Sequence, residues 1–500
     1  MRSLSKSKLM AFRQCPKRLW LEIHRSDLRE DSAATEAAFH VGHQVGEIAQ
    51  QLYDPGRTGI LIDAQKDGYA SALARSTELL RFSQPIFEAG FVAAGALAFA
   101  DVMLPMRNGA EPAWRMVEVK STTSVKDYHR DDVAVQAFVA RSAGVPLASI
   151  ALAHIDSAWT YPGAEDYRGL LVENDLTAEA FTRGEEVKDW IADAQAMGAR
   201  PDEPPVRTGK HCGAPYECGF LAYCQHQEPQ AEYPVQWLPR IQTKALKALV
   251  EGEGVSDLRD VPDTLLNKLQ LRVKTHTLSG QAYFDATGAA GELAPHKLPA
   301  YFLDFETIQF AVPIWKGTRP YQQLPFQFSV HRLSHTGKLE QQSFLDLSGD
   351  DPSLAFTKAL IASCGENGPV FVYNAAFEIT RMRELAQRFP WFEAALLAII
   401  ARVVDLLPIS GRRYYHPSQH GSWSIKRVLP AIAPDLRYDA LEGVQDGGMA
   451  MHAYQEAIHH STTRARKDQI AQQLLAYCGL DTFAMVRLWQ FLAGRSDLKL

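Results

Sequence analysis

The sequence lacks features that mark membrane-bound or secreted proteins. No run of about 18 apolar residues occurs, so no segment is predicted to cross a membrane. The N-terminus, MRSLSKSKLMAFRQCPKRLW, lacks the continuous apolar core of a signal peptide. Six cysteines in 500 residues are too few for a disulfide framework, and they fit free thiols or metal ligands better. We therefore expect a cytoplasmic protein without a membrane partner.

An excess of positive charge is also missing. The chain has 52 Lys and Arg against 58 Asp and Glu, which gives a formal net charge of −6. A polyanion is not attracted by the chain as a whole, so a nucleic-acid-binding surface would have to be a local groove. Composition neither predicts nor excludes a DNA partner. The hydrophobic content of 46% fits a folded chain, and the length suggests two large domains and a connector.

Hydrophobic periodicity indicates three regions. The first opens with a helical stretch around residues 9–24 and continues with the strand-like runs PIFEAGFVAAG, FADVMLP and RMVEVKS, the last two separated by the turn-rich RNGAEPAW. The second contains two amphipathic helical segments in KALKALVEGEGVSDLRDVPDTLLNKL, similar to a helix-hairpin-helix module. The third contains the strands YFLDFET, FQFSVHRL and PVFVYNA and ends on a long helix. We predict two α/β domains and a small helical connector, over residues 1–228, 299–500 and 229–298 respectively.

Four cysteines form a pattern. Cys212, Cys218 and Cys224 have five residues between neighbours, and Cys15 lies far upstream. Four thiolates hold either zinc or an iron-sulfur cluster, but structural zinc usually uses closely paired cysteines. Zinc and unrelated buried thiols are the alternatives. The Cys15-Pro16 pair with HCGAPYECGFLAYC resembles the nuclease family that includes the AddB subunit and CRISPR-adaptation exonucleases, which implies a [4Fe-4S] cluster around a RecB-like nuclease core.

A first acidic pattern lies within the cysteine frame. Glu118 and Lys120 are two apart on a predicted strand and therefore share a face. Asp101, on the neighbouring strand, is placed to hold a hard divalent cation with Glu118, while Lys120 orients water or stabilises a phosphate. This arrangement resembles the PD-(D/E)XK nucleases, which share the restriction-endonuclease-like fold.

The same resemblance implies further residues on two helices. Gln136 takes a catalytic position on the helix after the catalytic strand, and Glu47 takes a metal-binding position on an early helix. Gly46 stands where many relatives have His, and His43 is the second choice. Ordinary helix-surface positions are the alternative for Gln136 and Glu47. Glu88, on the preceding strand, is interpreted as an accessory residue rather than a ligand.

A second acidic pattern is spread over three segments. Asp304 and Glu306 are two apart on an apolar strand and face the same side, where two buried charges need a cation. Glu378 follows another strand, and Tyr477 and Asp481 are four apart on one helix face. This order resembles the DnaQ-like exonucleases of the ribonuclease H-like fold, in the branch with a Y-x-x-x-D third motif.

That resemblance implies a site for two Mg²⁺ or Mn²⁺ ions, with Tyr477 bound to the attacking water. The implied metal ligands are Asp304, Glu306, Glu378 and Asp481. Glu378 stands where the family normally has Asp, a substitution that also occurs in a bacterial group that the whole chain resembles.

Two further residues fall at positions that DnaQ-like proteins use. Asp405 matches a strand-end Asp, for which a helix cap or turn residue is the alternative. Lys426 falls in the substrate-side loop.

Together these patterns predict a metal-dependent DNA nuclease with two phosphodiesterase sites, acting in DNA repair or in defence against foreign DNA. Single-stranded DNA or a free DNA end is the favoured partner. The alternatives are a nucleic-acid-binding scaffold in which one or both sites are inactive, and an exonuclease that acts on RNA or short oligonucleotides.

Overall fold

The computed structural model describes residues 3–108 and 111–498. The chain divides into two compact units. Unit 1 comprises Met1–Pro229 and Phe310–Gln322, and unit 2 comprises Gln230–Gln309 and Gln323–Leu500. Both contain helices and mixed sheets, so the expected α/β class is confirmed. Among the described helices, none has the length and apolar composition that a membrane span needs.

Unit 1 is built on a mixed sheet that has seven strands in the described residues. The order is β2-β3-β4-β5-β6-β7, and β1 pairs with β4. The strands are β1 (Leu4–Ser5), β2 (Ile60–Leu61), β3 (Ile86–Ala93), β4 (Ala96–Asn108), β5 (Glu111–Lys120), β6 (Leu147–Ile155) and β7 (Leu171–Asp175). Strands β5 and β6 are parallel, and helix α6 (Asp127–Ser142) makes the crossover that such a pair requires.

Two sequence expectations for unit 1 need refinement. The predicted helix over 9–24 is two helices, α1 (Lys6–Gln14) and α2 (Pro16–His24). Cys15 is extended, with φ −161, and the proline begins α2, where its missing N–H is tolerated. Most of the expected turn in RNGAEPAW is strand, and residues 109–110 of it lie outside the described part of the chain.

Helices cover both faces of this sheet. Trp114 and Met116 of β5 share a core with α6, whereas Val119 of β5 packs against Val45 and Ile48 of α3 (Ala33–Tyr53). Because strand side chains alternate, α6 and α3 lie on opposite faces of β5. The other helices of unit 1 are α4 (Ala64–Asp67), α5 (Tyr69–Leu79), α7 (Thr177–Thr182), α8 (Gly184–Gly198) and α9 (Leu221–Gln227).

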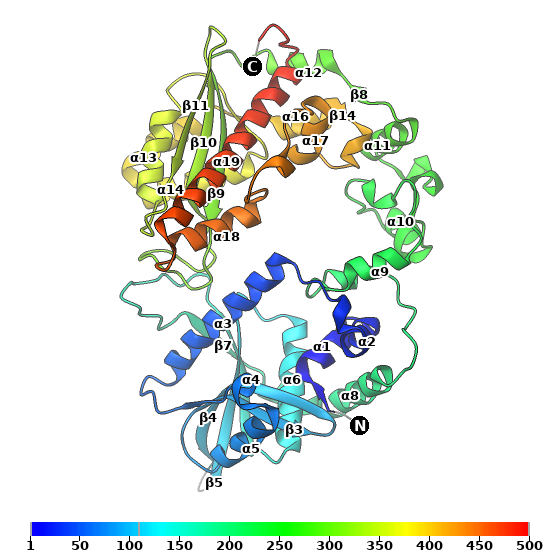
Figure 1. The fold of residues 1–500 in the computed structure, drawn as a ribbon, viewed down its shortest axis with the longest axis vertical. Coiled ribbons are helices and arrows are strands. Elements are labelled where there is room, and N and C mark those ends of the chain that lie inside the picture. The colour runs from blue at the N-terminus through cyan, green and yellow to red at the C-terminus, as the bar shows by residue number, and fades with distance from the viewer. Residues whose placement is uncertain (1–2, 109–110, 499–500) are drawn as a thin grey trace. The chain divides into compact units, whose positions relative to one another are not determined.

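Unit 2 contains a five-stranded sheet in the order β11-β10-β9-β12-β13. Strand β9 is antiparallel to β10 and parallel to β12. The long helix α19, red in Figure 1, packs on β9 and β10, and α13 packs on β10. The strands and these helices are β9 (Ala300–Ile308), β10 (Leu324–Leu333), β11 (Leu339–Leu345), β12 (Val370–Val372), β13 (Val403–Asp405), α13 (Ser353–Ser363) and α19 (Arg464–Leu492).

Strand β9 separates two hydrophobic cores. Phe302 stacks in the core that contains Trp489 of α19, whereas Leu303 and Phe305 lie in the core of α13. Asp304 and Glu306, which lie two and four residues after Phe302 on the same strand, therefore face α19 as well. The remaining elements are α12 (Ala286–Leu293), α14 (Ala376–Arg388), α15 (Glu393–Ile400), α16 (Leu406–Arg413), α17 (Ile425–Ile432), α18 (Gly447–Ile458) and the small β8–β14 pair (Tyr283–Phe284, Tyr414–Tyr415).

The expected helix hairpin of the connector differs from the structure. Residues 230–298 belong to unit 2. Helix α10 (Lys244–Lys247) is short and runs into a π turn. The second expected helix is replaced by two 3-10 turns around Pro262, because proline cannot supply a helical N–H. Helix α11 (Lys268–Ser279) begins only after Asn267, whose side chain caps it.

Candidate active sites

Strand β9 and helix α19 bring three carboxylates together in unit 2. Asp304, Glu306 and Asp481 each offer an oxygen atom within 4.8 Å of the others. Glu306 and Asp481 are buried, and Asp304 is partly buried. No other group of three or more potential metal ligands in residues 3–108 and 111–498 comes this close. We call these three residues the acidic site.

Burial and mutual repulsion raise the pKa values of the carboxylates of the acidic site. Burial, with repulsion from Asp481, raises the pKa of Glu306 to about 8. Burial raises the pKa of Asp481 to about 6. Burial and the charges of Asp481 and Glu306 raise the pKa of Asp304 well above its ordinary value. Three carboxylates can ionise together in such a place only if a cation joins them.

Two tyrosines and a lysine border the acidic site. The Tyr438 hydroxyl donates to Asp481 Oδ1 at 2.6 Å, and a hydrogen bond from Tyr477 lowers the pKa of the same carboxyl. Lys426 Nζ lies 5.0 Å from the ring centroids of both tyrosines. Its charge also lowers the pKa values of Glu306 and Asp481 and so opposes the effect of burial.

Glu378 lies near the acidic site without joining it. Its residue is 2% exposed, and its Oε2 atom has no hydrogen-bond partner in the described structure. Burial raises the pKa of Glu378 to about 8, and its charge contributes to the raised pKa of Asp304. The predicted fourth ligand is thus close enough to act on Asp304 but is not in the 4.8 Å group.

Asp405 is a cap, as the alternative interpretation held. Its carboxylate accepts the N–H groups of Asn374 and Ala375, each at 3.0 Å, and that of Leu407 at 2.9 Å. Asn374 has φ 80, in the left-handed region that strains a non-glycine residue. Asp405 therefore stabilises the turn that leads to Glu378 and starts helix α16.

In unit 1, the predicted residues Asp101, Glu118 and Lys120 lie where β4 and β5 separate. The last pair between these strands is Val102 with Val117, and the Val119 N–H then donates to Asp101 Oδ2 at 2.7 Å. Glu118 and Lys120 form an ion pair on the face that α6 covers. We call Asp101, Glu118, Lys120 and the groups bound to them the lysine site.

Two residues that the motif does not contain complete the lysine site. Lys6 Nζ lies 2.8 Å from Glu118 Oε1 and 3.3 Å from Asp132 Oδ1. Lys120 Nζ lies 2.6 Å from Asp132 Oδ2 and also contacts Glu118 Oε1. Gln136, as expected from its position, reaches this site and donates to Glu118 Oε2. Two ammoniums and two carboxylates thus form a closed ring of ion pairs.

The lysines control the electrostatics of this ring. Burial would raise the pKa of Glu118, but Lys120 and Lys6 outweigh it and hold that pKa below its ordinary value. Burial would lower the pKa of Lys6, but Asp132 and Glu118 raise it instead. Asp101 lies outside the ring, and burial raises its pKa well above the ordinary value. Glu118 is therefore ionised and already paired.

The structure does not bring Glu47 into the lysine site. Its neighbours Val45 and Ile48 pack α3 on the sheet face opposite α6, and the Glu47 side chain is exposed. His43 is also exposed. Glu88 lies across from Asp101 in the β3–β4 register and has φ 57, a left-handed conformation. Burial and Glu118 raise the pKa of Glu88, which agrees with an accessory position beside the site.

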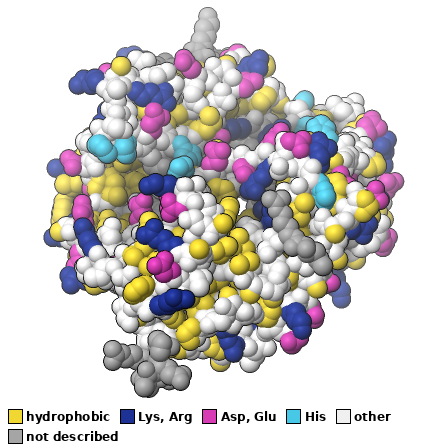
Figure 2. All heavy atoms as spheres, turned by 60° about the horizontal axis from the view of Figure 1, so that its bottom comes forward, with side chains coloured by type: hydrophobic (Ala, Val, Ile, Leu, Met, Phe, Trp, Pro, Cys, Tyr) yellow, Lys and Arg dark blue, Asp and Glu magenta, His cyan; other side chains and the backbone are white. Residues whose placement is uncertain are grey.

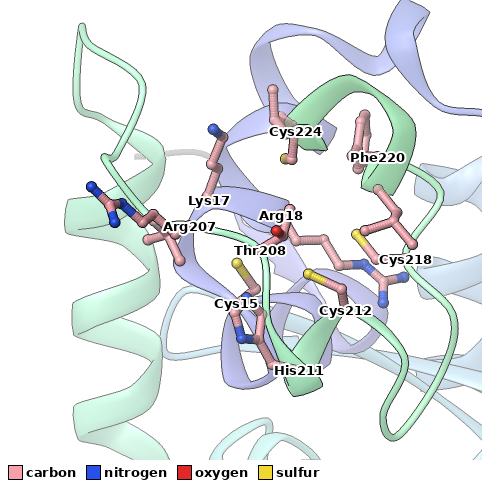
Figure 3. Close-up of a pocket in the computed structure, with 13 residues that line it drawn as sticks. Cys15, Lys17, Arg18, Arg207, Thr208, His211, Cys212, Cys218, Phe220 and Cys224 are labelled. Atoms are coloured by element: carbon pink, nitrogen blue, oxygen red, sulfur yellow. The ribbon is translucent and has the colours of Figure 1, made fainter. Parts of the chain in front are cut away.

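The four cysteines predicted as cluster ligands line one pocket, and their sulfur atoms point into it (Figure 3). Cys15 separates α1 from α2, and Cys224 lies in α9. Cys212 ends a 3-10 turn, and Cys218 lies in the loop that follows it. None of the four forms a disulfide. No three of their sulfur atoms lie within 4.8 Å of one another.

The cysteine pocket is apolar but has basic side chains in its wall. Lys17, Arg18 and Arg207 line it together with the thiols. Burial raises the pKa of Cys224 to about 11 and that of Cys218 above its ordinary value, while Lys17 and Arg18 oppose these shifts. The Cys218 and Cys224 thiols therefore stay protonated near neutral pH unless a metal displaces their protons.

One face of the molecule carries charges of both signs. On the face drawn in Figure 2, Lys and Arg side chains are interspersed with Asp and Glu. This distribution fits the near-balanced composition.

Three residues at the sites were missed by the motif search. Asp132 lies four residues before Gln136 and therefore on the same helix face, a spacing that would have indicated it. Lys6 and Tyr438 carry no comparable signal, since their partners Glu118 and Asp481 are distant in sequence.

A comparison with protein families matches residues 301–424 to a domain of unknown function (DUF2779). The matched segment contains Asp304, Glu306, Glu378 and Asp405, and it ends before α19. The comparison with curated proteins gives no match.

Proposed function

We propose that the chain is a metal-dependent nuclease and that the acidic site hydrolyses phosphodiester bonds at the 3′ end of DNA. The observation that carries this proposal is the close approach of Asp304, Glu306 and Asp481, with pKa values raised by burial and mutual repulsion. Ligands that are all oxygen favour hard cations such as Mg²⁺ or Mn²⁺. The sheet order, with three antiparallel strands followed by two parallel ones, supports a ribonuclease H-like, DnaQ-type interpretation of unit 2.

The side chains have separate tasks in this proposal. Asp304, Glu306 and Asp481 would hold the cation, and Glu378 is near enough to join when the carboxylates ionise. The bound cation would supply activation of water and stabilisation of the leaving oxygen. Tyr477, which hydrogen-bonds Asp481, would orient the water, and buried aromatic neighbours would limit access of bulk solvent.

Unit 1 is proposed to be a PD-(D/E)XK nuclease domain. Asp101 and Glu118 stand at the point where two strands separate, and Lys120 is on the same face as Glu118. Gln136 donates to Glu118 from the crossover helix, so its implied role is supported by a contact. In this interpretation Lys120 stabilises the charge on a substrate phosphate.

The cysteine pocket is proposed to hold a [4Fe-4S] cluster. Four thiols with no disulfide supply the required donors, and the basic wall suits an anionic cluster. A single tetrahedral zinc would need sulfur atoms only about 3.8 Å apart, from a Zn–S distance of about 2.3 Å. The wider spacing of these sulfurs favours the larger cluster. Free thiols also favour a reducing compartment, here proposed to be the cytoplasm.

The deciding experiment measures cleavage of end-labelled single-stranded DNA, double-stranded DNA and RNA with Mg²⁺ or Mn²⁺. It compares the parent protein with Lys120→Ala, Asp304→Ala and the double variant. We expect each single variant to lose a different class of products and the double variant to lose all cleavage. If the parent cuts neither DNA nor RNA, the nuclease proposal is wrong and the chain is a binding scaffold.

The cluster is tested separately by anaerobic purification with iron and sulfide analysis. We expect about four iron and four sulfide per chain, as a [4Fe-4S] cluster contains, and loss of both with Cys212→Ser. The matched control is Cys364→Ser, because Cys364 is a buried thiol of unit 2. Stoichiometric zinc without sulfide would contradict the cluster.

A further inference from the structure

We propose that Lys6 is a second phosphate-binding residue of the lysine site and that it acts beside Lys120 on one phosphodiester of a nucleic acid. Asp132 is the counter-ion that positions both ammoniums. This inference rests on the proposed function of unit 1, but it concerns binding, which can be measured without cleavage. The PD-(D/E)XK pattern supplies one lysine, and the structure adds the other.

Backbone pairing of the N-terminal segment places Lys6 at the lysine site. Strand β1 is parallel to β4, with Leu4 opposite Ala96. Ser5 then caps α1, because its hydroxyl accepts the Lys8 N–H at 3.3 Å, so Lys6 is the first residue of the helix. Helix α1 also packs on α6, the helix that carries Asp132. The position of Lys6 is therefore set by the sheet and two helices.

The carboxylates and the ammoniums of the ring differ in their exposure to solvent. The side chains of Glu118 and Asp132 are 1% and 9% exposed, whereas those of Lys6 and Lys120 are 20% and 22% exposed. The carboxylates are thus buried beneath the ammoniums. An anion arriving from solvent meets the two lysines before it meets either acid.

The ammoniums also have donors left for such an anion. Each lysine has three N–H groups and no acceptor. Lys6 Nζ donates one of them to Glu118 and lies 3.3 Å from Asp132 Oδ1, an atom that has no hydrogen-bond partner in the described residues. Lys120 Nζ contacts both Glu118 and Asp132. At least one donor on each lysine remains, and a phosphodiester has two free oxygens to accept them. Because a phosphate carries no base identity, the contact is independent of sequence.

Charge balance supports an anionic ligand. Two lysines compensate Glu118 and Asp132, so the ring is neutral before any ligand binds. A divalent cation bound at Asp101 would add positive charge beside this ring. The phosphodiester would then be the anion that neutralises it.

The test is binding of a fluorescent single-stranded oligonucleotide in EDTA, followed by anisotropy across a range of salt concentrations. Lys6→Met and Lys120→Met are compared with Lys8→Met, a control on the same helix whose side chain has no partner in the described structure. We expect the slope of log affinity against log salt to fall by about 0.7 for each site variant, the value for one phosphate contact on a single strand. The control should keep the slope of the parent protein. Lys6→Arg should have a slope close to that of the parent, because arginine keeps the positive charge that Lys6→Met removes.

A purely structural ion pair is distinguished by the double variant Lys6→Met with Asp132→Asn. Removing both partners relieves the unpaired charge and should restore thermal stability toward that of the parent. If Lys6 binds phosphate, the stable double variant has a smaller salt slope than Asp132→Asn alone. If Lys6 is only structural, the two variants have the same slope, and the inference is overturned.

Failure of this inference differs from failure of the proposed function. A chain that cleaves DNA but whose Lys6→Met variant keeps the full salt slope has nuclease activity without the second phosphate contact. A chain whose Lys6→Met variant loses slope, but which never cleaves, has the phosphate site without the proposed activity. If the parent does not bind the oligonucleotide in EDTA, this inference is wrong, and the proposed function is still decided by cleavage in the presence of Mg²⁺ or Mn²⁺.

Discussion

The lysine site of unit 1 and the acidic site of unit 2 both bury carboxylates, but they differ in what balances the charge. In the lysine site, Glu118 is paired with two ammoniums and its pKa lies below the ordinary value. In the acidic site, Glu306 has no such pair and its pKa is raised to about 8. Similar residue types at similar burial thus reach opposite protonation states because their neighbours differ.

This difference indicates what each site needs from outside. The acidic site brings together carboxylates whose mutual repulsion a divalent cation would relieve. The lysine site is already compensated, and its partly exposed ammoniums would favour an anion.

The largest expected effect is on cleavage. Asp304→Asn should reduce trimming of a labelled 3′ end by about a thousandfold, because metal chemistry is worth several kcal/mol and each 1.4 kcal/mol is about tenfold. The matched control is Asp468→Asn, on the exposed part of α19. Trimming that survives Asp304→Asn would show that the acidic site is not the exonuclease centre.

The difference between the two sites can be tested by stability, because variants at the two sites should change the free energy of unfolding in opposite directions. Glu118→Gln should lower the free energy of unfolding by about 3–5 kcal/mol, because it removes the buried carboxylate that two partly buried lysines share and leaves both of them on Asp132. Asp304→Asn in EDTA should raise it by about 1 kcal/mol, because it removes a repelled buried carboxyl. Urea unfolding measures both. Two changes of the same sign would remove the distinction between the sites.

Metal bound at the acidic site should stabilise unit 2 against unfolding. At 100 times the dissociation constant, Mn²⁺ should add about 2.7 kcal/mol to the free energy of unfolding. Asp481→Asn should abolish this gain, whereas Lys120→Met should keep it, since Lys120 lies in the other unit. Thermal melting with and without Mn²⁺ tests this, and a gain that depends on Lys120 instead would reverse the assignment.

A further expected effect is a pH dependence of stability in EDTA. Glu306 has a pKa of about 8 in the folded chain against an ordinary 4.5, so the folded state binds more protons between these values. The free energy of unfolding should therefore fall as pH rises through this window, by about 1.4 kcal/mol per unit. Glu118 has the opposite shift, and its contribution is lost only as pH falls below about 4.5.

Glu306→Gln separates these two contributions. The variant should reduce the slope above pH 5 by the contribution of Glu306, leave the contributions of Glu378 and Asp481, and keep the acid limb of Glu118. Unfolding by urea at a series of pH values measures both limbs. An unchanged slope above pH 5 would mean that Glu306 is not held protonated in the metal-free chain.

Local periodicity explains which parts of the sites were predictable. A period of two on strands placed Asp304 with Glu306 and Glu118 with Lys120, and the four-residue spacing placed Tyr477 with Asp481 on one helix face. The mixed α/β class followed from the same patterns. The cysteine spacing indicated a shared site, and the four thiols do line one pocket.

Positions that depend on long-range packing were not predictable in this way. Glu47 is on a helix that covers the other sheet face, and sequence spacing carries no information about which face a helix takes. Lys6 reaches Glu118 because β1 pairs with β4, a strand that is distant from it in the sequence. The helix hairpin expected in the connector failed because Pro262 divides its second helix.

By itself, the sequence determined the secondary structure around the motifs and the pairs of side chains within each element, because these depend on backbone periods of a few residues. The tertiary structure alone decided which pairs meet and what neutralises them. Asp481 joins Asp304 only through packing of α19 on β9, and Lys6 and Asp132 enclose Glu118 only through packing of α1 on α6. Charge balance in a buried site depends on distances in space, and those distances are set by the fold.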